Sequence, residues 1–494
     1  MYYISTRNAQ NRVTAAQAIL SGLAGDGGLF VPERIPKLEK LQSFVGMSYQ
    51  DCALAVLGEY LDDFSPEDLY DCVKNAYTTE KFGSDKIAPL YHLDDTVSFL
   101  ELWHGPTCAF KDMALQILPH FLTKAIKMQK TDKTIVILVA TSGDTGKAAL
   151  EGFSGVKGTK IVVFYPAGGV SQIQKLQMVT QEGDNVCTAA VKGNFDDVQS
   201  FVKQIFTDEG YRQRLNHNGY DFSSANSINW GRLVPQIVYY VYSYCQLVEQ
   251  GRLAMGEPMN VVVPTGNFGN ILAAYYAKKA GVPIQKLICA SNRNNILTDF
   301  IRTGIYDKNR EFSLTISPSM DILISSNLER LLYDLSDTET VIGLIENLQK
   351  CGRYEVPASM KEKLDSLFWA GYCDDDETRR TIRETFEKHS YLVDTHTAVG
   401  YHVYQQYVAE TGDQTKTVLA STASPFKFNQ SVYQALRGAV PENTSEFELL
   451  SLLSKQTGAP VPTSLRELAD KKVRFNQTVS RDEMYDVVSG FLGL

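Results

Sequence analysis

A strand, a tight turn and a helix follow one another in the stretch Val261-Val262-Val263-Pro264-Thr265-Gly266-Asn267-Phe268-Gly269-Asn270-Ile271-Leu272-Ala273-Ala274. Gly266 and Gly269 allow the backbone N–H groups of the turn to point one way, and Asn270 can cap the helix. We interpret this turn as a phosphate cradle, because a helix N-terminus adds positive potential. It is not a dinucleotide fingerprint, since GxGxxG is absent. A glycine turn is usually only structural, so the phosphate hypothesis needs support elsewhere.

The same alternation of short strands and helices repeats along the chain. Strands are predicted at Thr134–Val139, Lys160–Tyr165, Asn260–Val263, Lys286–Ala290 and Lys416–Ala420. Helices are predicted at Lys147–Phe153, Gln172–Glu182, Asp196–Phe206, Leu233–Gln250 and Asn270–Ala280. This order predicts an α/β protein with parallel sheets that carry helices on both faces.

The chain has 494 residues, too many for one hydrophobic core, so two or three domains are expected. Helical patterns predict an N-terminal helical domain over residues 1–95. A small α/β domain is expected over 96–235 and a large one over 236–494. Within the large domain, residues 301–392 are charged and helical, which predicts an insertion that could close over a substrate.

Composition excludes several classes of function. The net charge is -9 and the isoelectric point is near 5.4, which argues against nucleic acid or an anionic membrane as a partner. No apolar run approaches the length of a membrane span, and no secretory signal is visible. The eight cysteines show no CxxC spacing, so reduced thiols and a cytoplasmic location are expected. The seven histidines form no HExxH or HxH pattern, so we expect no metal site.

Lys111 lies where a loop becomes a helix, after the chain break at Gly105-Pro106. A lysine in the first helical turn opposes the helix dipole, and burial beside Phe110 and Met113 would further penalise its charge. Both effects lower the pKa of the amine, as a Schiff-base lysine requires. Taken alone, most such lysines are ordinary surface residues, so the neighbouring motifs decide the interpretation.

A second glycine turn follows the strand Thr134–Val139. Its Gly146-Lys147 pair is similar to a nucleotide-binding P-loop, but Thr141 replaces the first glycine and Ala148 replaces the Ser/Thr that would hold magnesium. The hydroxyl groups of Ser142 and Thr145 suit a small carboxylate instead. Asp144 is an acceptor in this turn, so we expect it to face a group that carries a proton.

Two further polar clusters are notable. Asn226, Ser227 and Arg232 precede a long apolar helix, and a guanidinium there could bind a phosphate in a bidentate manner. The alternative is a helix cap beside a surface arginine, and the two are equally plausible from this cluster alone. The loop Ser421-Thr422-Ala423-Ser424-Pro425-Phe426-Lys427-Phe428 ends a predicted strand in small hydroxyl residues and is uninformative by itself.

Together, these segments resemble the threonine synthase family, which consists of fold-type II pyridoxal-phosphate (PLP) enzymes related to tryptophan synthase β. The length and the 301–392 region resemble its longer fungal and bacterial branch. The resemblance runs nearly end to end, over Ser5–Arg7, Gly25–Pro32, His104–Asp112, Thr141–Gly146, Asn226–Arg232, Gly266–Asn270, Asp394–Gly400 and Ser421–Phe428. Two departures, Asn8 for a common glycine and Ser424 for a common histidine, leave Lys111 and the glycine turn untouched.

The resemblance implies a fold of two open, mostly parallel sheets flanked by helices, and a role for each motif. Lys111 would hold PLP covalently with Phe110 beside the ring, Asp144 would lie near the phenolic oxygen, and Thr422 would bind the pyridine nitrogen. The phosphate of PLP would be held by Gly266, Asn267, Phe268, Gly269 and Asn270. The substrate would be bound by Ser142, Thr145, Asn226, Ser227 and Arg232.

The implied activity is that of a carbon–oxygen lyase, which converts O-phospho-L-homoserine and water to L-threonine and phosphate. Lys111 would act as the base once freed from PLP. A monomer or a homodimer is expected. Three alternatives stay open: a related phospho-lyase that releases 2-oxobutyrate, a serine/threonine dehydratase, and a non-catalytic binding protein with this fold. The dehydratase is disfavoured because it has no use for a phosphate site at Arg232, and the non-catalytic protein because Lys111 and its flanks are intact.

Overall fold

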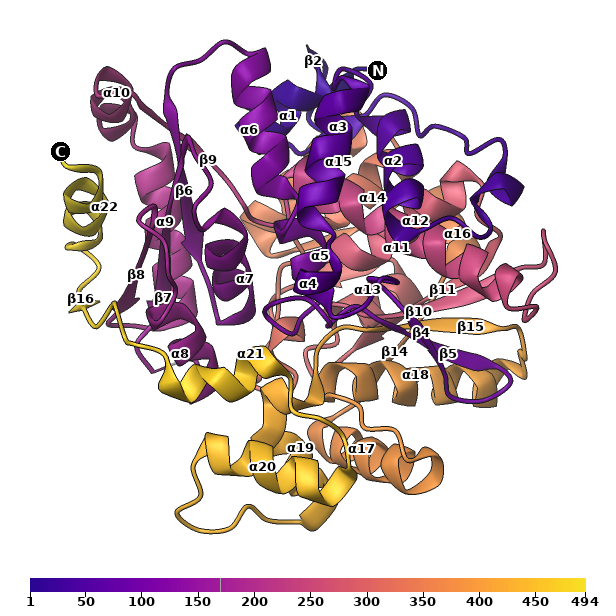
Figure 1. Cartoon of the computed structure of the whole chain (residues 1–494). Coiled ribbons are helices and arrows are strands. Elements are labelled where there is room, and N and C mark those ends of the chain that lie inside the picture. Colours follow the sequence, from indigo (N-terminus) through magenta and orange to yellow (C-terminus); the bar gives the residue numbers. More distant parts are fainter. Residues whose placement is uncertain (169) are drawn as a thin grey trace.

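Two open sheets form the centre of the computed structural model, which describes residues 1–168 and 170–494 (Figure 1). The larger sheet has the order β14 (Phe368–Tyr372), β11 (Ile284–Ser291), β10 (Met259–Pro264), β15 (Thr417–Ser421), β5 (Val97–Glu101), β4 (Leu90–His92). Only β4 is antiparallel to its neighbour. The smaller sheet is parallel throughout, with the order β16 (Thr478–Val479), β8 (Val186–Val191), β7 (Thr159–Pro166), β6 (Thr134–Ala140), β9 (Tyr220–Ser223). The predicted fold class is confirmed.

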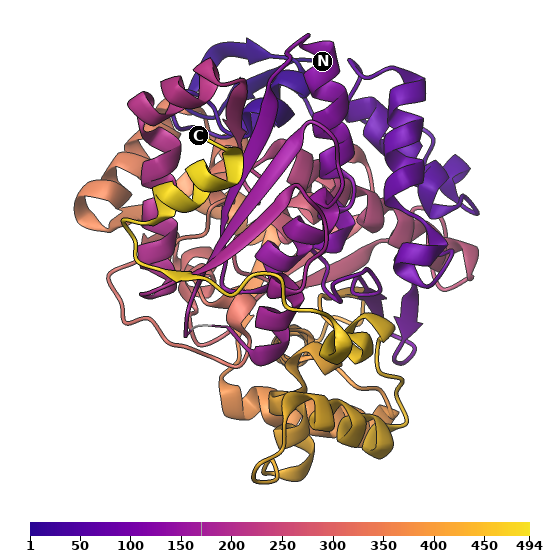
Figure 2. The same cartoon turned by 60° about the vertical axis from the view of Figure 1, so that its left-hand side comes forward.

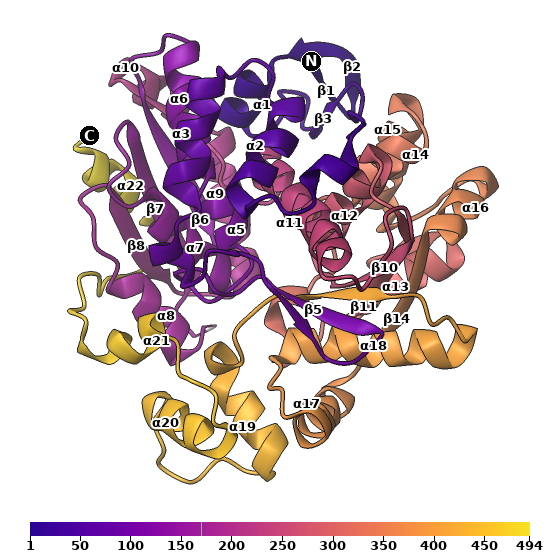
Figure 3. The same cartoon turned by 45° about the vertical axis from the view of Figure 1, so that its right-hand side comes forward.

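Helices cover both faces of each sheet. In the larger sheet, α11 (Trp230–Glu249) and α12 (Gly269–Ala280) lie on one side and α18 (Thr395–Thr411) on the other (Figure 3). Outside α18 pack α17 (Asp375–His389), α19 (Asn429–Arg437) and α20 (Glu446–Thr457). The smaller sheet is covered by α7 (Asp144–Phe153) and α8 (Gln172–Val179), and on the opposite face by α9 (Phe195–Thr207), α10 (Glu209–His217) and α22 (Met484–Leu492).

The N-terminal region is mainly helical, as predicted. It contains α1 (Ala15–Ser21), α2 (Tyr49–Tyr60), α3 (Pro66–Ala76) and α4 (Thr79–Phe82). It also contains a small antiparallel sheet that the sequence analysis did not predict, formed by β2 (Asn8–Val13), β1 (Tyr3–Ser5) and β3 (Phe30–Pro32). β1 and β3 have only three residues each, and β2 consists mostly of exposed polar residues, so none of the three shows an apolar periodic pattern in the sequence.

Residues 301–392 are largely helical, as expected. The helices are α13 (Ile296–Thr303), α14 (Leu328–Leu335), α15 (Thr338–Cys351), α16 (Ala358–Leu367) and α17, which belongs to the layer outside α18. Two short strands, β12 (Ile305–Asp307) and β13 (Arg353–Glu355), pair with each other. The segment is not only an insertion, because β14 forms the edge of the larger sheet beside β11.

Membership of the sheets does not follow the order of the chain. β5 precedes all strands of the smaller sheet, yet it pairs with β15 in the larger one. β16 comes last and returns to the smaller sheet, along whose outer side the C-terminal segment runs (Figure 2). The chain therefore crosses between the sheets three times, and Lys111 lies on the first crossing. The predicted domain limits stay predictions.

None of the helices in the described residues is long and apolar enough to cross a membrane. All eight cysteines are free thiols, and only Cys351 among them is exposed.

Candidate active site

Lys111 lies between the two sheets, immediately before the short helix α5 (Asp112–Leu115), which Figure 1 shows at the centre of the molecule. Its side chain is 11% exposed. The pKa of Lys111 is lowered to about 8, chiefly by burial. Asp144 opposes this shift, and the nearby cations Lys427 and Arg232 contribute to it. The lowered pKa that we predicted is therefore present.

The cause of the lowered pKa differs in part from the expectation. α5 has only four residues, and the chain turns at Gln116 and Ile117 before α6 (Leu118–Met128) begins. A helix of one turn has a weak dipole, so burial rather than the dipole is the main cause. Gly105 permits the close packing of this loop, because a Cβ at that position would lie 2.5 Å from the Cβ of Asp112.

A buried cluster of charges surrounds the Lys111 amine. Asp144 Oδ2 lies 3.8 Å from Lys111 Nζ, and Asp144 Oδ1 lies 3.0 Å from the ammonium of Lys427, whose side chain is fully buried. Gln174 Nε2 also donates to Asp144 Oδ1 at 2.9 Å. Burial alone would raise the pKa of Asp144, but Lys427 and Lys111 outweigh burial and hold it well below its usual range. Asp144 faces proton carriers as predicted, and the role of Lys427 was missed.

The glycine turn between β10 and α12 has the predicted strand–turn–helix form. Phe268 takes a left-handed conformation, with φ of 63°, and stands at the N-cap of α12. Asn270 lies inside the helix instead of capping it, because the turn ends one residue earlier than expected. Its Oδ1 accepts a hydrogen bond from the Tyr240 hydroxyl, while its buried Nδ2 has no partner among the described residues. An unpaired buried donor beside a helix N-terminus fits the phosphate of PLP.

Residues from the 301–392 region brace this turn. Ser325 Oγ donates to the carbonyl of Gly266 at 2.7 Å, and the backbone N–H of Asn327 donates to the carbonyl of Asn267 at 3.1 Å. Gly266 is itself required, because a Cβ there would lie 2.5 Å from the carbonyl oxygen of Ser319. Sequence reasoning missed these braces, since small polar residues in a loop carry no distinctive signal.

Arg232 is buried at the start of α11 without a carboxylate partner among the described residues. Nη1 donates to the carbonyl of Ala225 at 2.6 Å, and Nε has no partner. Burial lowers the pKa of Arg232 to about 10. The helix cap of the alternative interpretation is also present, because Asn229 Oδ1 accepts from the N–H of Gly231. Asn229 therefore caps the helix, and Arg232 is buried and is not a surface residue.

The rest of the substrate cluster approaches the glycine turn. Ser227 Oγ lies 3.4 Å from Ser326 Oγ, which in turn donates to Asn267 Oδ1 at 3.2 Å. Asn226 is half-buried beside it in the chain. The hydroxyl of Ser326 thus connects Ser227 to the glycine turn.

Thr422 and Phe110 are adjacent to Lys111. The N–H of Phe110 donates to the carbonyl of Thr422 at 2.8 Å, and Ala109 forms a bridge with Ala423. Lys111 Nζ lies 4.8 Å from the centre of the Phe110 ring. The loop after β15 is therefore held against the lysine loop by backbone contacts.

The turn of Ser142 and Thr145 is shaped by Thr141, whose Oγ1 accepts from the N–H groups of Gly143 at 3.0 Å and Gly146 at 2.9 Å. Ser142 is exposed and Thr145 is half-buried. Lys147 is buried and pairs with Glu151 at 2.9 Å, so it is not available to bind a nucleotide phosphate in the manner of a P-loop lysine.

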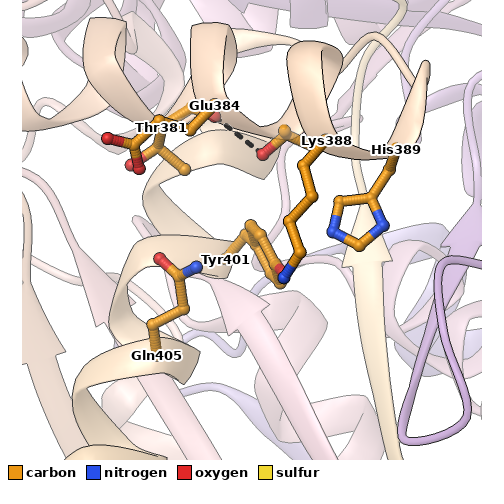
Figure 4. Close-up of a pocket in the computed structure, with 7 residues that line it drawn as sticks. Thr381, Glu384, Lys388, His389, Tyr401 and Gln405 are labelled. Carbon is orange, nitrogen blue, oxygen red and sulfur yellow. Dashed lines mark hydrogen bonds between the residues drawn. The ribbon is translucent and has the colours of Figure 1, made fainter.

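Other polar features lie apart from this site. A hollow of about 180 Å³ between α17 and α18 is lined by residues such as Glu384, Lys388, His389 and Tyr401 (Figure 4). None of the predicted site residues lines it. Nearby, the possible metal-ligand atoms of Cys373, Glu377 and His402 lie within 4.8 Å of one another. The Cys373 thiol already contacts Thr378, however, and the Glu377 carboxylate accepts the N–H of Asp374. Neither feature includes a residue of the predicted site.

Family models match the chain over almost its full length. The model described as threonine synthase N terminus matches residues 2–77, the pyridoxal-phosphate dependent enzyme model matches 85–422, and the threonine synthase C-terminal model matches 397–488. Threonine synthase from Saccharomyces cerevisiae is 39% identical over 88% of this chain and 89% of its own length. This chain belongs to the threonine synthase family. It is accordingly a PLP-dependent enzyme.

Solved structures in the family have the same fold. The PLP-bound threonine synthase from Brucella melitensis is 36% identical and has a TM-score of 0.87, and the match covers 100% of this chain and 98% of that protein. The yeast threonine synthase structure is 34% identical over 100% of this chain and 99% of its own, with a TM-score of 0.88. Human threonine synthase-like 1 is 40% identical over 98% of this chain, which spans 67% of that relative's length.

Proposed function

We propose that this enzyme converts O-phospho-L-homoserine and water to L-threonine and phosphate. The observation that carries the proposal is a buried amine of lowered pKa, Lys111, in a site that also has two buried donors without partners among the described residues. One donor is Asn270 Nδ2 in the glycine turn, and the other is Arg232 Nε. A substrate that carries its own phosphate requires a second anion site in addition to the one for PLP.

PLP, when bound, supplies an aldehyde that links covalently to amines and a ring that withdraws electrons from the bonds at the substrate Cα. Lys111 is the residue that would hold it, with Phe110 beside the ring. Gly266, Asn267, Phe268, Gly269 and Asn270 would hold its phosphate. Thr422 would face the pyridine nitrogen and Asp144 the phenolic oxygen.

The Lys111 amine, when it is free, would act as the general base. A pKa of about 8 leaves part of the amine neutral near pH 7, and a desolvated neutral amine accepts a proton readily. Lys111 Nζ would take the Cα proton and then a Cβ proton while the Cγ–O bond breaks and phosphate leaves. Protons would return to Cγ, which becomes a methyl group, and to Cα. Water would add its hydroxyl group at Cβ, and its remaining proton would go to the released phosphate. The burial of the site limits the entry of other water molecules.

Arg232 positions the leaving phosphate in this scheme, with Asn226 and Ser227 beside it. A buried guanidinium with an unpaired Nε offers charge-assisted hydrogen bonds to a phosphate oxygen. Ser142 and Thr145, in the turn that starts α7, would bind the substrate carboxylate.

The reaction is tested by incubating the purified enzyme with O-phosphohomoserine and identifying the product by NMR. We expect threonine and phosphate. The second candidate function, release of 2-oxobutyrate, stays open because the chain is also 40% identical to human threonine synthase-like 1, a relative that is named as like a threonine synthase. Detection of 2-oxobutyrate in place of threonine would select it.

The role of Lys111 is tested separately by reduction with borohydride in the presence of PLP. We expect covalent label on Lys111, and no label and no PLP absorption band in Lys111→Ala. Lys427→Met is the matched control, because it removes a neighbouring buried amine and should retain the label. Labelling of Lys427 instead would reassign the cofactor lysine.

The wider setting is also proposed. We place the enzyme in the cytoplasm, because its cysteines are free and mostly buried, as in a reducing compartment. Its partner is a small-molecule substrate, and we expect a monomer or a homodimer.

A further inference from the structure

Ser319 occupies the gap between Lys111 and Asp144. The distance of 3.8 Å from Lys111 Nζ to Asp144 Oδ2 is too long for a hydrogen bond. Ser319 Oγ lies 3.3 Å from each of these two atoms and links them. It stands in the 3₁₀ turn Pro318–Met320, within the 301–392 region, and 208 residues separate it from Lys111 in the sequence.

The direction of these two hydrogen bonds follows from the charge of Asp144. An ionised carboxylate only accepts, and its lowered pKa keeps Asp144 ionised, so the Ser319 hydroxyl proton must point toward Oδ2. The lone pairs of Ser319 Oγ are then left for Lys111, which donates an N–H to them. Because one N–H of the amine is fixed toward Ser319, its lone pair must point elsewhere in the site.

Ser319 is itself held by a buried pair. Its backbone N–H lies 3.1 Å from His396 Nε2, and a backbone N–H only donates, so Nε2 is an acceptor. The proton of the neutral imidazole is then on Nδ1, which donates to Asp394 Oδ2 at 2.7 Å. Asp394 is fully buried and also accepts the N–H groups of His396 and Thr397 at the start of α18. The hydrogen bonds that link Asp394, His396 and Ser319 therefore have only one possible arrangement of donors and acceptors.

We propose that Ser319 is a further catalytic residue, which accepts an N–H of Lys111 and so aims the lone pair of that amine, and that His396 and Asp394 are positioning residues that fix Ser319. This inference rests on the proposed role of Lys111 as the base. It also gives the 301–392 region a defined part in the site, because the turn at 318–320 both orients the amine and packs against Gly266 of the glycine turn.

The test measures the pKa of Lys111 in the cofactor-free protein, from the pH dependence of its labelling by cyanate, read on the Lys111 peptide by mass spectrometry. Ser319→Ala removes an acceptor that stabilises the ammonium, so the midpoint should fall by about 1 pH unit. Ser319→Thr retains the hydroxyl and should keep the wild-type midpoint. His396→Asn removes the acceptor for the Ser319 N–H and should shift the midpoint in the same direction as Ser319→Ala.

The matched control is Ser317→Ala. Ser317 is buried in the same segment, and its hydroxyl contacts Asn292 and Thr315 but not Lys111. An unchanged or raised midpoint in Ser319→Ala, or an equal shift in Ser317→Ala, would overturn the proposal. In the PLP-loaded enzyme, Ser319→Ala should lower kcat by about 10²-fold with little change in KM, since misplacement of a reacting group has costs of this order. The borohydride experiment tests the role of Lys111 without depending on Ser319. Failure of the proposed function can therefore be distinguished from failure of this inference.

Discussion

At the scale of single residues, Arg232 and Arg330 form an informative contrast. Both are buried arginines whose pKa burial lowers to about 10. Arg330 donates to the carbonyl oxygens of Phe30 at 3.0 Å and Ile228 at 2.6 Å, and to Asn327 Oδ1. Arg232 has one carbonyl acceptor and an unpaired Nε. The first arrangement is what a structural residue needs, and the second is what a ligand-binding residue needs.

We therefore expect opposite effects from two identical substitutions. Arg232→Met should leave the free energy of unfolding unchanged or higher, because it removes an incompletely paired buried charge, and should lower kcat/KM by about 10²–10³-fold. Arg330→Met should lower the free energy of unfolding by about 3 kcal/mol, because several buried acceptors lose their donor. Urea unfolding and steady-state kinetics measure both quantities. A destabilised Arg232→Met variant would show that this arginine is structural.

Asp144 and Asp112 should affect the pH dependence of stability in opposite directions. The pKa of Asp144 is lowered in the folded state, so its stabilising contribution is present above about pH 4 and is lost as the pH falls. Burial raises the pKa of Asp112 to about 6, so its contribution becomes unfavourable as the pH rises from about 4 to 6. Urea unfolding between pH 3 and 8 should show a shallower acid loss in Asp144→Asn. In Asp112→Asn, the free energy of unfolding should rise more steeply with pH between pH 4 and 6 than in the wild type. The same pH dependence of the free energy of unfolding in both variants would contradict these assignments.

At the scale of elements, the turn between β10 and α12 depends on close contact with the turn at 318–320. Gly266→Ala would place a Cβ against the backbone of Ser319, so that one of the two turns must move. We expect PLP affinity, measured by absorbance titration, to fall about tenfold or more, for a steric cost of about 1–3 kcal/mol. Gly343→Ala on α15 is the control, because its Cβ meets nothing within 4 Å and alanine favours the helix. Unchanged affinity in Gly266→Ala would mean that the turn adapts freely.

The sequence predicted those elements whose information is local. The five strands and five helices named in advance are present within a few residues, because apolar periodicity and glycine turns are properties of short stretches. Lys111, Asp144 and Arg232 were recognisable for the same reason, as each stands in a distinctive local motif. Ser319 and Lys427 were not, since their importance arises only when distant segments meet at Asp144. β14 was missed because it follows a long helical segment without a turn signal of its own.

At the scale of the whole molecule, the last residues complete the smaller sheet. Met484 and Val488 on α22 are fully buried in the cluster that also contains Phe201 and Val136. Met484→Ala should lower the free energy of unfolding by about 2–4 kcal/mol, through lost burial and a residual cavity. Hydrogen exchange should then increase in β6, β7 and β8 more than in β10 and β11. Met255→Ala is the control, because Met255 is exposed. Uniform exchange throughout both sheets would show that they unfold as one unit.

The threefold crossing of the chain has a consequence during synthesis on the ribosome. β5 emerges early, yet its neighbour β15 emerges more than 300 residues later and must insert between β5 and β10. Until then the nascent polypeptide exposes the unsatisfied edge of an apolar strand, which is a template for incorrect pairing. Neither sheet can be completed before β15 and β16 have been synthesised, so production of the enzyme in a cell should depend on chaperones that shield the edge of β5 until β15 emerges.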